Sequence, residues 1–235
     1  MSWILKLYDT YEQCVSNLLF QEEQPSLLPI GHSTQQGHIR IVLNGNGKFL
    51  RANEFDEKTR VTIPVTEKSL TGRTSGPAPH PLMDKIQYCA KDYSQYGNSK
   101  SYFGRYEKQL AAWCDAHSKA KAVLAYVRQG RVVQDLLEAG VLHNGENGPV
   151  ASLWKIDLED LFICWSVETF EEPAADTWAD LSLQNAWIRL DATSRKDSSC
   201  GLCYVTGIKQ QLSDKQPSKI RHPADGAKLI SSNDS

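Results

Sequence analysis

Apolar side chains recur at spacings of three and four over residues 2–18, a period that predicts an amphipathic helix. Residues 21–37 contain two prolines and many polar side chains, and they predict a loop. Residues 38–53 contain two strand-like runs joined by residues 44–47 (Asn-Gly-Asn-Gly), which tolerate the positive φ of a tight turn. This pattern predicts a β-hairpin.

A third strand is predicted at residues 60–65, and we expect it to join the hairpin. Pro64 has no amide hydrogen, so this strand should lie at a sheet edge or end there. Residues 66–81 are rich in glycine and proline, and three prolines within five residues preclude a helix. This segment is predicted to be a loop.

Residues 82–140 are predicted to be mostly helical. Apolar periodicity indicates helices at residues 82–93, 101–117, 119–129 and 131–139. Gly130 and Gly140 close the last two helices, at positions where a left-handed cap is needed. Trp113 lies on the apolar face of the second helix, so we expect it to be buried.

The remaining elements are a strand at residues 160–167, a helix at 177–190, a polar connection at 191–199 and a short strand at 201–206. Together the elements predict an α+β fold, with an antiparallel sheet that contains the hairpin and a helical insertion in the middle of the chain. The hairpin should pack one face on the strand at 160–167 or on the helix at 101–117.

Composition places the chain among ordinary globular proteins. Its 235 residues are 40% hydrophobic and 23% charged, which excludes a disordered, collagen-like or coiled-coil chain. No apolar stretch approaches the roughly 18 residues of a membrane span, and the start lacks the layout of a secretory signal. Six scattered cysteines do not form a disulfide scaffold, so we expect a reducing cytoplasm.

Charge is distributed unevenly along the chain. The net charge is −2, yet residues 58–131 carry 13 basic and 5 acidic side chains, a net charge of +8. Residues 192–235 sum to +3, and residues 154–191 sum to −7. If the fold places the two basic regions on one face, that face attracts polyanions; otherwise these charges only solvate helix faces.

Catalytic motifs are not apparent. The sequence contains no phosphate-binding loop, dinucleotide fingerprint or zinc-protease helix, and its histidines lack ligand-like spacing. Cys200-Gly-Leu-Cys203 could be half of a zinc site, but Cys164 and His222 are the nearest further ligand candidates and each stands alone. The alternative is that Cys203 is a buried strand residue and Cys200 lies in a turn. We expect no catalysis, no metal and no cofactor.

Loop 66–81 is the best candidate for a nucleic-acid contact. Its prolines restrict the backbone, its glycines allow close approach, and polar side chains lie at its tip. Arginine can hold the O6 and N7 atoms of guanine with two hydrogen bonds, and threonine and serine can reach phosphates or base edges. An ordinary surface loop is the alternative.

Seven segments resemble one family, and they follow its order along the chain. They are Met1-Ser-Trp-Ile-Leu-Lys-Leu-Tyr-Asp-Thr-Tyr, Leu27-Leu-Pro-Ile-Gly-His-Ser-Thr, Ile63-Pro-Val-Thr-Glu, Arg73-Thr-Ser-Gly-Pro-Ala-Pro-His-Pro-Leu-Met-Asp-Lys with Tyr88, Cys203-Tyr-Val-Thr-Gly, Pro217-Ser-Lys-Ile-Arg and Ala227-Lys-Leu-Ile-Ser-Ser-Asn-Asp. The chain is similar to the large subunit of the subtype I-C CRISPR interference complex (Cascade).

The resemblance implies a non-catalytic subunit near the 5′ handle of the crRNA. Such subunits recognise the protospacer-adjacent motif (PAM) on double-stranded DNA and help to open the duplex. Their partners are the crRNA, the backbone and handle-binding subunits, and a helicase-nuclease that is recruited to the complex. Base pairing then reads the target sequence, while the protein reads only the short duplex motif.

Together with the loop chemistry, the resemblance assigns DNA contacts to Lys68, Thr71, Arg73, Thr74 and Ser75. Phosphate contacts, to DNA or to the crRNA handle, are assigned in a second basic segment, to Lys219, Arg221 and Lys228. A structural adaptor that holds subunits without reading DNA is the alternative function, and a small zinc protein is another.

The family's members are much longer than this chain. Residues 1–235 are therefore expected to be a single N-terminal α+β domain, helical at about 82–140, of a large subunit whose carboxy-terminal domain is absent. Residues 168–176 are more acidic than a DNA-facing surface should be, so this segment should face away from DNA.

Overall fold

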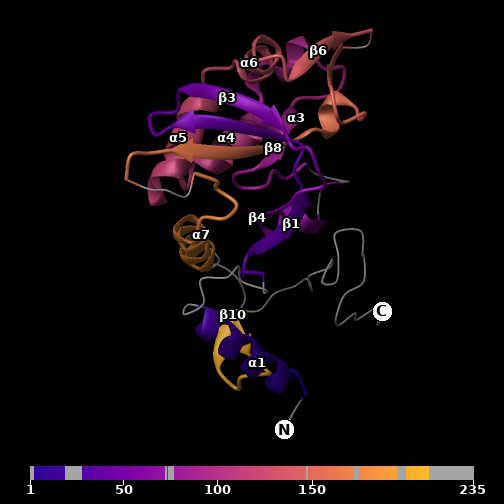
Figure 1. The fold of residues 1–235 in the computed structure, drawn as a ribbon. Helices are drawn as coiled ribbons and strands as arrows, with labels where there is room; N and C mark the ends of the chain where they lie inside the picture. The colour runs from indigo at the N-terminus through magenta and orange to yellow at the C-terminus, as the bar shows by residue number, and fades with distance from the viewer. Residues whose placement is uncertain are drawn as a thin grey trace, which may run out of the picture. The chain divides into compact units, whose positions relative to one another are not determined.

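The protein divides into two compact units. A computed structural model describes residues 3–18, 28–71, 73, 77–146, 148–171, 175–194 and 200–211. The larger unit is Gly31–Leu190, and the smaller combines Met1–Ile30 with Asp191–Ser235 (Figure 1).

A four-stranded sheet forms the centre of the larger unit. Its order is β3 (Phe49–Glu54), β2 (Ile39–Asn44), β8 (Phe162–Glu168) and β5 (Asp84–Lys85). The β2–β3 and β5–β8 pairs are antiparallel, whereas β2 and β8 run parallel. The predicted α+β class and hairpin are confirmed, with one parallel pair inside the sheet.

The parallel pair corrects the expected packing of the hairpin. Ile39 of β2 lies beside Ile163 of β8 in the hydrogen-bonded register, so the two segments share one sheet and do not stack face to face. Strand β8 is buried along its first six residues, which is typical of a central strand covered on both faces.

Helices cover one face of this sheet (Figure 1). Helix α5 (Ser118–Val127) contacts β2 and β8, and α4 (Phe103–Ala111) packs against α5. The ring of Tyr126 lies 6.2 Å from that of Phe49 and 5.9 Å from that of Trp165, so one α5 side chain spans the sheet from β3 to β8. These contacts are part of one continuous hydrophobic core.

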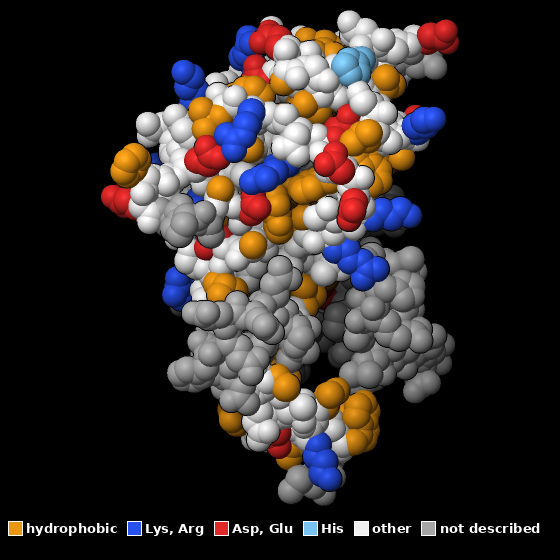
Figure 2. All heavy atoms as spheres, in the orientation of Figure 1, with side chains coloured by type: hydrophobic (Ala, Val, Ile, Leu, Met, Phe, Trp, Pro, Cys, Tyr) orange, Lys and Arg blue, Asp and Glu red, His pale blue; other side chains and the backbone are white. Residues whose placement is uncertain are grey.

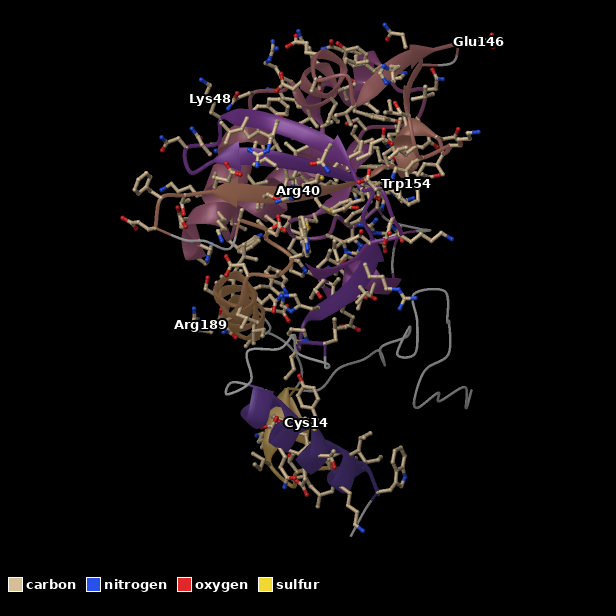
Figure 3. All side chains as sticks on the ribbon, viewed as in Figure 1. Cys14, Arg40, Lys48, Glu146, Trp154 and Arg189 are labelled. Carbon is tan, nitrogen blue, oxygen red and sulfur yellow. The ribbon has the colours of Figure 1, made fainter. Side chains whose placement is uncertain are left out.

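The other face of the sheet carries polar pairs. Arg40 of β2, labelled in Figure 3, donates from Nε to Ser166 Oγ at 2.8 Å and pairs with Asp176 at 2.6 Å. Arg51 of β3 pairs with Glu168 at 2.5 Å. Part of the acidic segment 168–176 is therefore neutralised by arginines of the hairpin.

The central helical region is shorter and more broken than predicted. Residues 82–93 form strand β5, the single turn α3 (Ile86–Cys89) and most of the 3-10 helix η1 (Lys91–Gln95). The last helix, α6, spans Val132–Glu138. Gly130 and Gly140 have φ values of 71° and 70°, which confirms the predicted left-handed caps after α5 and α6.

A separate two-stranded sheet corrects the expected place of the third strand. Strand β4 (Arg60–Pro64) ends at Pro64 but pairs antiparallel with β1 (His32–Gln36), not with the hairpin. Strand β1 falls in the segment predicted to be a loop, because His-Ser-Thr-Gln-Gln has no apolar alternation. A further hairpin, β6 (Leu142–Gly145) with β7 (Gly148–Ala151), was not predicted.

The smaller unit contains the predicted N-terminal helix, α1 (Trp3–Leu18). Strand β9 (Cys200–Leu202) pairs antiparallel with β10 (Lys209–Gln211), so the strand predicted at 201–206 gives way to a turn after residue 202. Helix α7 (Leu181–Ser194) begins in the larger unit and replaces part of the connection predicted at 191–199. Among the described residues, no helix is long and apolar enough to cross a membrane.

The hairpin tip depends on a single glycine. Gly47 has a φ of +73°, and a Cβ at this position would lie 2.4 Å from the carbonyl oxygen of Ala122 on α5. Gln129 also donates to the Gly47 carbonyl at 2.9 Å. We expect Gly47→Ala to lower the free energy of unfolding by at least about 2 kcal/mol, because left-handed strain of roughly 1–2 kcal/mol adds to a clash with backbone.

Gly140→Ala is the matched control for this prediction. Gly140 has a φ of +70°, but no atom lies within 4 Å of its added Cβ, so this variant carries the backbone strain without the clash. Urea denaturation of both variants measures the difference. Equal losses of stability in the two variants would show that the hairpin tip is not in close contact with α5.

Candidate nucleic-acid interface

The segment 66–81 begins with a short helix, α2 (Glu67–Thr71), and not with a loop. Thr66 Oγ1 accepts from the Ser69 amide at 3.1 Å, while the Thr66 amide donates to Ser69 Oγ at 2.9 Å. This reciprocal pair satisfies amides that a helix N-terminus leaves free. The prolines that exclude a helix all follow residue 76, so they do not prevent this turn.

Three aromatic side chains hold the far end of the segment. Trp113 donates from its indole to the carbonyl of Pro81 at 3.0 Å. The carbonyl of Leu82 accepts from the Trp165 indole at 2.9 Å and from the Tyr106 hydroxyl at 2.5 Å. Strand β8 and the helical region therefore fix the backbone where the segment enters β5.

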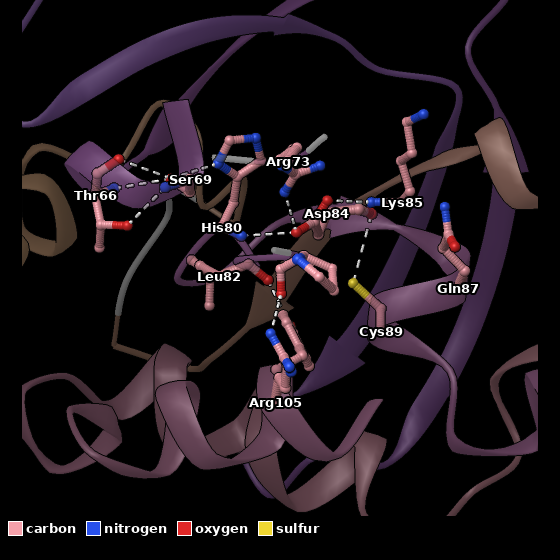
Figure 4. A network of polar contacts seen from close by, with 12 residues as sticks. Thr66, Ser69, Arg73, His80, Leu82, Asp84, Lys85, Gln87, Cys89 and Arg105 are labelled. Carbon is pink, nitrogen blue, oxygen red and sulfur yellow. Dashed lines mark hydrogen bonds and ion pairs between the residues drawn. The ribbon is translucent and has the colours of Figure 1, made fainter. Parts of the chain in front are cut away.

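Two further contacts hold the segment between its ends. The ring of His80 lies with Nδ1 3.0 Å from Ser69 Oγ, which ties the end of the segment back to α2. Arg105 of α4 donates to the carbonyl of Pro77 at 3.3 Å. Figure 4 shows these contacts around the start of β5. The base of the segment is thus held by side chains from several elements.

Arg73 lies at the centre of this network. Its Nη2 donates to Asp84 Oδ2 at 2.5 Å (Figure 4). Its Cζ lies 4.8 Å from the ring centroid of Tyr88. The Asp84 side chain is completely buried, whereas 26% of the Arg73 side chain is exposed. The guanidinium therefore bridges a buried carboxylate and the protein surface.

Asp84 has a fixed set of donors. Oδ2 also accepts from the amide of His80 at 2.7 Å, and Oδ1 accepts from the amide of Lys85 at 2.7 Å. Burial raises the pKa of Asp84 above its usual value, although Arg73 and the two amides oppose this effect. The charged form of this carboxyl thus depends on its partners.

Comparison with known proteins identifies the chain. The family model described as CRISPR-associated protein (Cas_Csd1) matches residues 7–235. This chain belongs to the Csd1 family. No curated protein shows a significant match. The predicted resemblance to a Cascade large subunit is confirmed, and the chain is a CRISPR-associated component of the Cascade type.

The predicted site residues of this Csd1 chain are described only in part. Lys68 is exposed on α2, Thr71 ends that helix, and Arg73 has the contacts given above. The other five assigned residues lie outside the described part of the chain: Thr74, Ser75, Lys219, Arg221 and Lys228. On the face seen in Figure 2, basic and acidic side chains are interspersed over the larger unit and do not form one basic patch.

Asp84, Tyr88 and His80 were missed as members of this site. Asp84 follows Pro81-Leu-Met, and a carboxylate in such an apolar run signals a buried group that needs a cationic partner. Arg73 lies only 11 residues earlier in the chain. That pairing could have been proposed from the sequence, whereas the stacking of Arg73 on Tyr88 could not.

The structure corrects the expected surroundings of Cys200 and of Cys203. Cys200 is exposed in strand β9, and Cys203 is partly exposed in the turn that follows, so the predicted positions in a turn and in a buried strand are wrong. Within the described ranges, no three metal-ligating side chains gather in one place. Cys164 is fully buried in β8.

The thiol of Cys203 is unusually acidic because of the turn that follows it. Hydrogen bonds from the side chain and amide of Thr206, and then from the Val205 amide, lower the pKa of Cys203 to about 7. We expect alkylation of Cys203 by iodoacetamide to reach half its maximal rate near pH 7, and Thr206→Val to move this midpoint upward. Peptide mass spectrometry on Cys200→Ser protein follows the single site, and a midpoint near pH 9 would contradict the expectation.

Proposed function

We propose that this chain is a non-catalytic subunit of a type I-C RNA-guided complex and recognises the PAM on double-stranded DNA, helping to open the duplex. Family membership supports a place in such a complex. The observation that carries the proposal is Arg73, a partly exposed guanidinium held at the base of a braced segment. Base pairing with the crRNA supplies the remaining sequence specificity.

The bracing of segment 66–81 suits recognition of a short motif. Side-chain anchors at Pro77, Pro81 and Leu82 reduce the conformational entropy that binding would otherwise remove. The segment also lies within residues 58–131, whose net charge of +8 would attract the phosphate backbone without regard to sequence. Electrostatic attraction would bring the DNA duplex to the segment, and a fixed arginine would then form hydrogen bonds with a base edge only where the base matches.

The assigned residues divide into two roles. We propose that Arg73, with Thr71, Thr74 and Ser75, reaches a groove edge and that Lys68 contacts the adjoining phosphates. Lys219, Arg221 and Lys228 would bind phosphates of DNA or of the crRNA handle. The backbone and handle-binding subunits and the recruited helicase-nuclease complete the set of partners, in the prokaryotic cytoplasm.

Substitution of Arg73 in the assembled complex tests the proposal. If Arg73 reads a guanine, Arg73→Ala should cost roughly 1–3 kcal/mol on a target with the cognate PAM and much less on a non-cognate target. Arg73→Lys should restore only part of the loss, because an ammonium group cannot reproduce two-pronged hydrogen bonding. The measurement is binding to duplexes that differ only in the PAM, at fixed salt.

Arg128→Ala is the matched control. Arg128 also lies within residues 58–131 and also pairs with a carboxylate, that of Glu107 at 2.9 Å. It should weaken cognate and non-cognate binding equally. Equal losses for Arg73→Ala on both targets would reduce Arg73 to a phosphate contact, and no loss on either would favour the structural adaptor. Thermal unfolding confirms that each variant is folded.

The second basic segment should act without sequence preference. Removing both Lys219 and Arg221 should lower affinity about equally for all duplexes, because phosphate contacts carry no sequence information. The slope of log affinity against log salt should flatten by up to roughly two units. A changed PAM preference at an unchanged salt slope would contradict the assignment.

A further inference from the structure

We infer that Asp84 and Tyr88 are positioning residues that hold the Arg73 guanidinium in one orientation for reading a base edge. Neither side chain reaches the surface, since Asp84 is completely buried and 4% of Tyr88 is exposed. They act on DNA only through Arg73. The inference rests on the proposed function and assigns a specificity role within the same site.

The carboxylate supplies the first constraint. Each of its oxygens accepts a hydrogen bond from a backbone amide, that of His80 or that of Lys85. The carboxyl group therefore cannot rotate without losing a buried hydrogen bond. Arg73 Nη2 donates to a carboxylate whose own position is therefore fixed. Charge-assisted hydrogen bonds of this kind are shorter and roughly twice as strong as neutral ones.

The aromatic ring supplies a second, independent constraint. The guanidinium lies over the ring of Tyr88, and the Tyr88 ring is supported in turn by Tyr102, with centroids 5.1 Å apart. Asp84 anchors one nitrogen, while the ring limits movement of the guanidinium perpendicular to the ring. Arg73 Nε is buried, so that side of the group faces the protein. Nη1 and the second hydrogen of Nη2 are then the donors for a ligand.

The same pairing changes what Arg73 prefers to bind. An arginine next to a carboxylate attracts phosphates less, because its charge is largely cancelled at a distance. Its hydrogen-bond donors keep their direction, so it can still recognise the paired acceptors of a guanine. Asp84 therefore favours base reading by Arg73 over non-specific phosphate binding.

Asp84→Asn distinguishes positioning from simple charge. The substitution removes a negative charge, so bulk electrostatics alone predicts tighter binding to every duplex. Positioning predicts that the ratio of cognate to non-cognate affinity falls on the order of 10-fold, within the range measured for one bidentate contact. It also predicts a salt slope steeper by about one unit, because the released Arg73 acts as an additional phosphate contact.

Asp160→Asn is the matched control in the assembled complex. Asp160 pairs with Lys85 at 2.5 Å, is half-exposed, and its substitution changes the net charge by the same amount. It should leave the affinity ratio unchanged. Asp84→Asn should also have no further effect on this ratio in an Arg73→Ala background, because a positioning residue has nothing left to position.

Tyr88 provides a second test if Asp84→Asn does not fold. Tyr88→Leu should lower the affinity ratio, and Tyr88→Phe, which keeps the ring, should rescue it. An unchanged ratio in Asp84→Asn or in Tyr88→Leu, with a lowered ratio in Arg73→Ala, would overturn this inference and leave the proposed function standing. No effect of Arg73→Ala would instead overturn the proposed function.

Discussion

Replacing Trp113 by alanine should lower the free energy of unfolding by about 3–5 kcal/mol, the range typical of a buried tryptophan. The side chain is 2% exposed, and its ring lies edge-on to that of Trp187 at 5.4 Å. Its indole also donates to the Pro81 carbonyl. The substitution therefore opens a cavity and removes a hydrogen bond that holds segment 66–81.

Two variants separate these effects in urea denaturation. Trp113→Phe keeps an aromatic ring but loses the indole donor, so it should cost less than Trp113→Ala. Trp3→Ala removes a tryptophan that is 58% exposed and should change stability by no more than about 0.5 kcal/mol. A folded Trp113→Ala protein of wild-type stability would show that this packing is wrong.

Elements with a local signal were predictable from the sequence. The hairpin was predictable because residues 44–47 combine turn chemistry with flanking apolar runs. Gly130 and Gly140 likewise end helices through their own backbone conformation. Each of these features depends on residues that are neighbours in the chain, so the sequence pattern contains most of the information.

Pairings between distant segments were not predictable. Strand β2 pairs with β8, which lies more than 100 residues later in the chain. No feature of either strand alone specifies a parallel neighbour. Strand β1 is polar and pairs with β4 because the fold brings the two together, not because its pattern requires a strand. Tertiary context decided both cases.

The candidate site shows the same division. Arg73 was predicted from the chemistry of its loop, together with the family resemblance. Its ion pair with Asp84 and its stacking on Tyr88 depend on how β5 and α3 fold back under the loop. These neighbours change the interpretation of Arg73 from a free side chain at a loop tip to one that is held in place.

A buried ion pair joins helix α5 to the start of α7. Lys119 Nζ lies 2.5 Å from Asp180 Oδ2, and the lysine side chain is completely buried. Asp180 Oδ1 also accepts from the amides of Ser182 and Leu183, at 2.9 and 3.2 Å, and so caps α7. Burial alone would raise the pKa of Asp180, but hydrogen bonds from Lys119, Ser182 and Leu183 outweigh it and lower the pKa overall.

Asp180→Asn should therefore cost about 3–5 kcal/mol, because it leaves the Lys119 ammonium buried without its carboxylate. The amide oxygen can still cap α7, so the loss reports the ion pair and not the helix end. Lys119→Met combined with Asp180→Asn should recover more than half of the lost stability, since neither charge of the pair remains buried.

The stability that the ion pair contributes should also depend on pH. Because the pKa of Asp180 is lowered on folding, the stability advantage of the wild-type protein over Asp180→Asn should be full above about pH 4 and fade as the pH falls further. Urea denaturation between pH 3 and pH 7 measures all three proteins, and a double variant no more stable than Asp180→Asn would contradict this account of the pair.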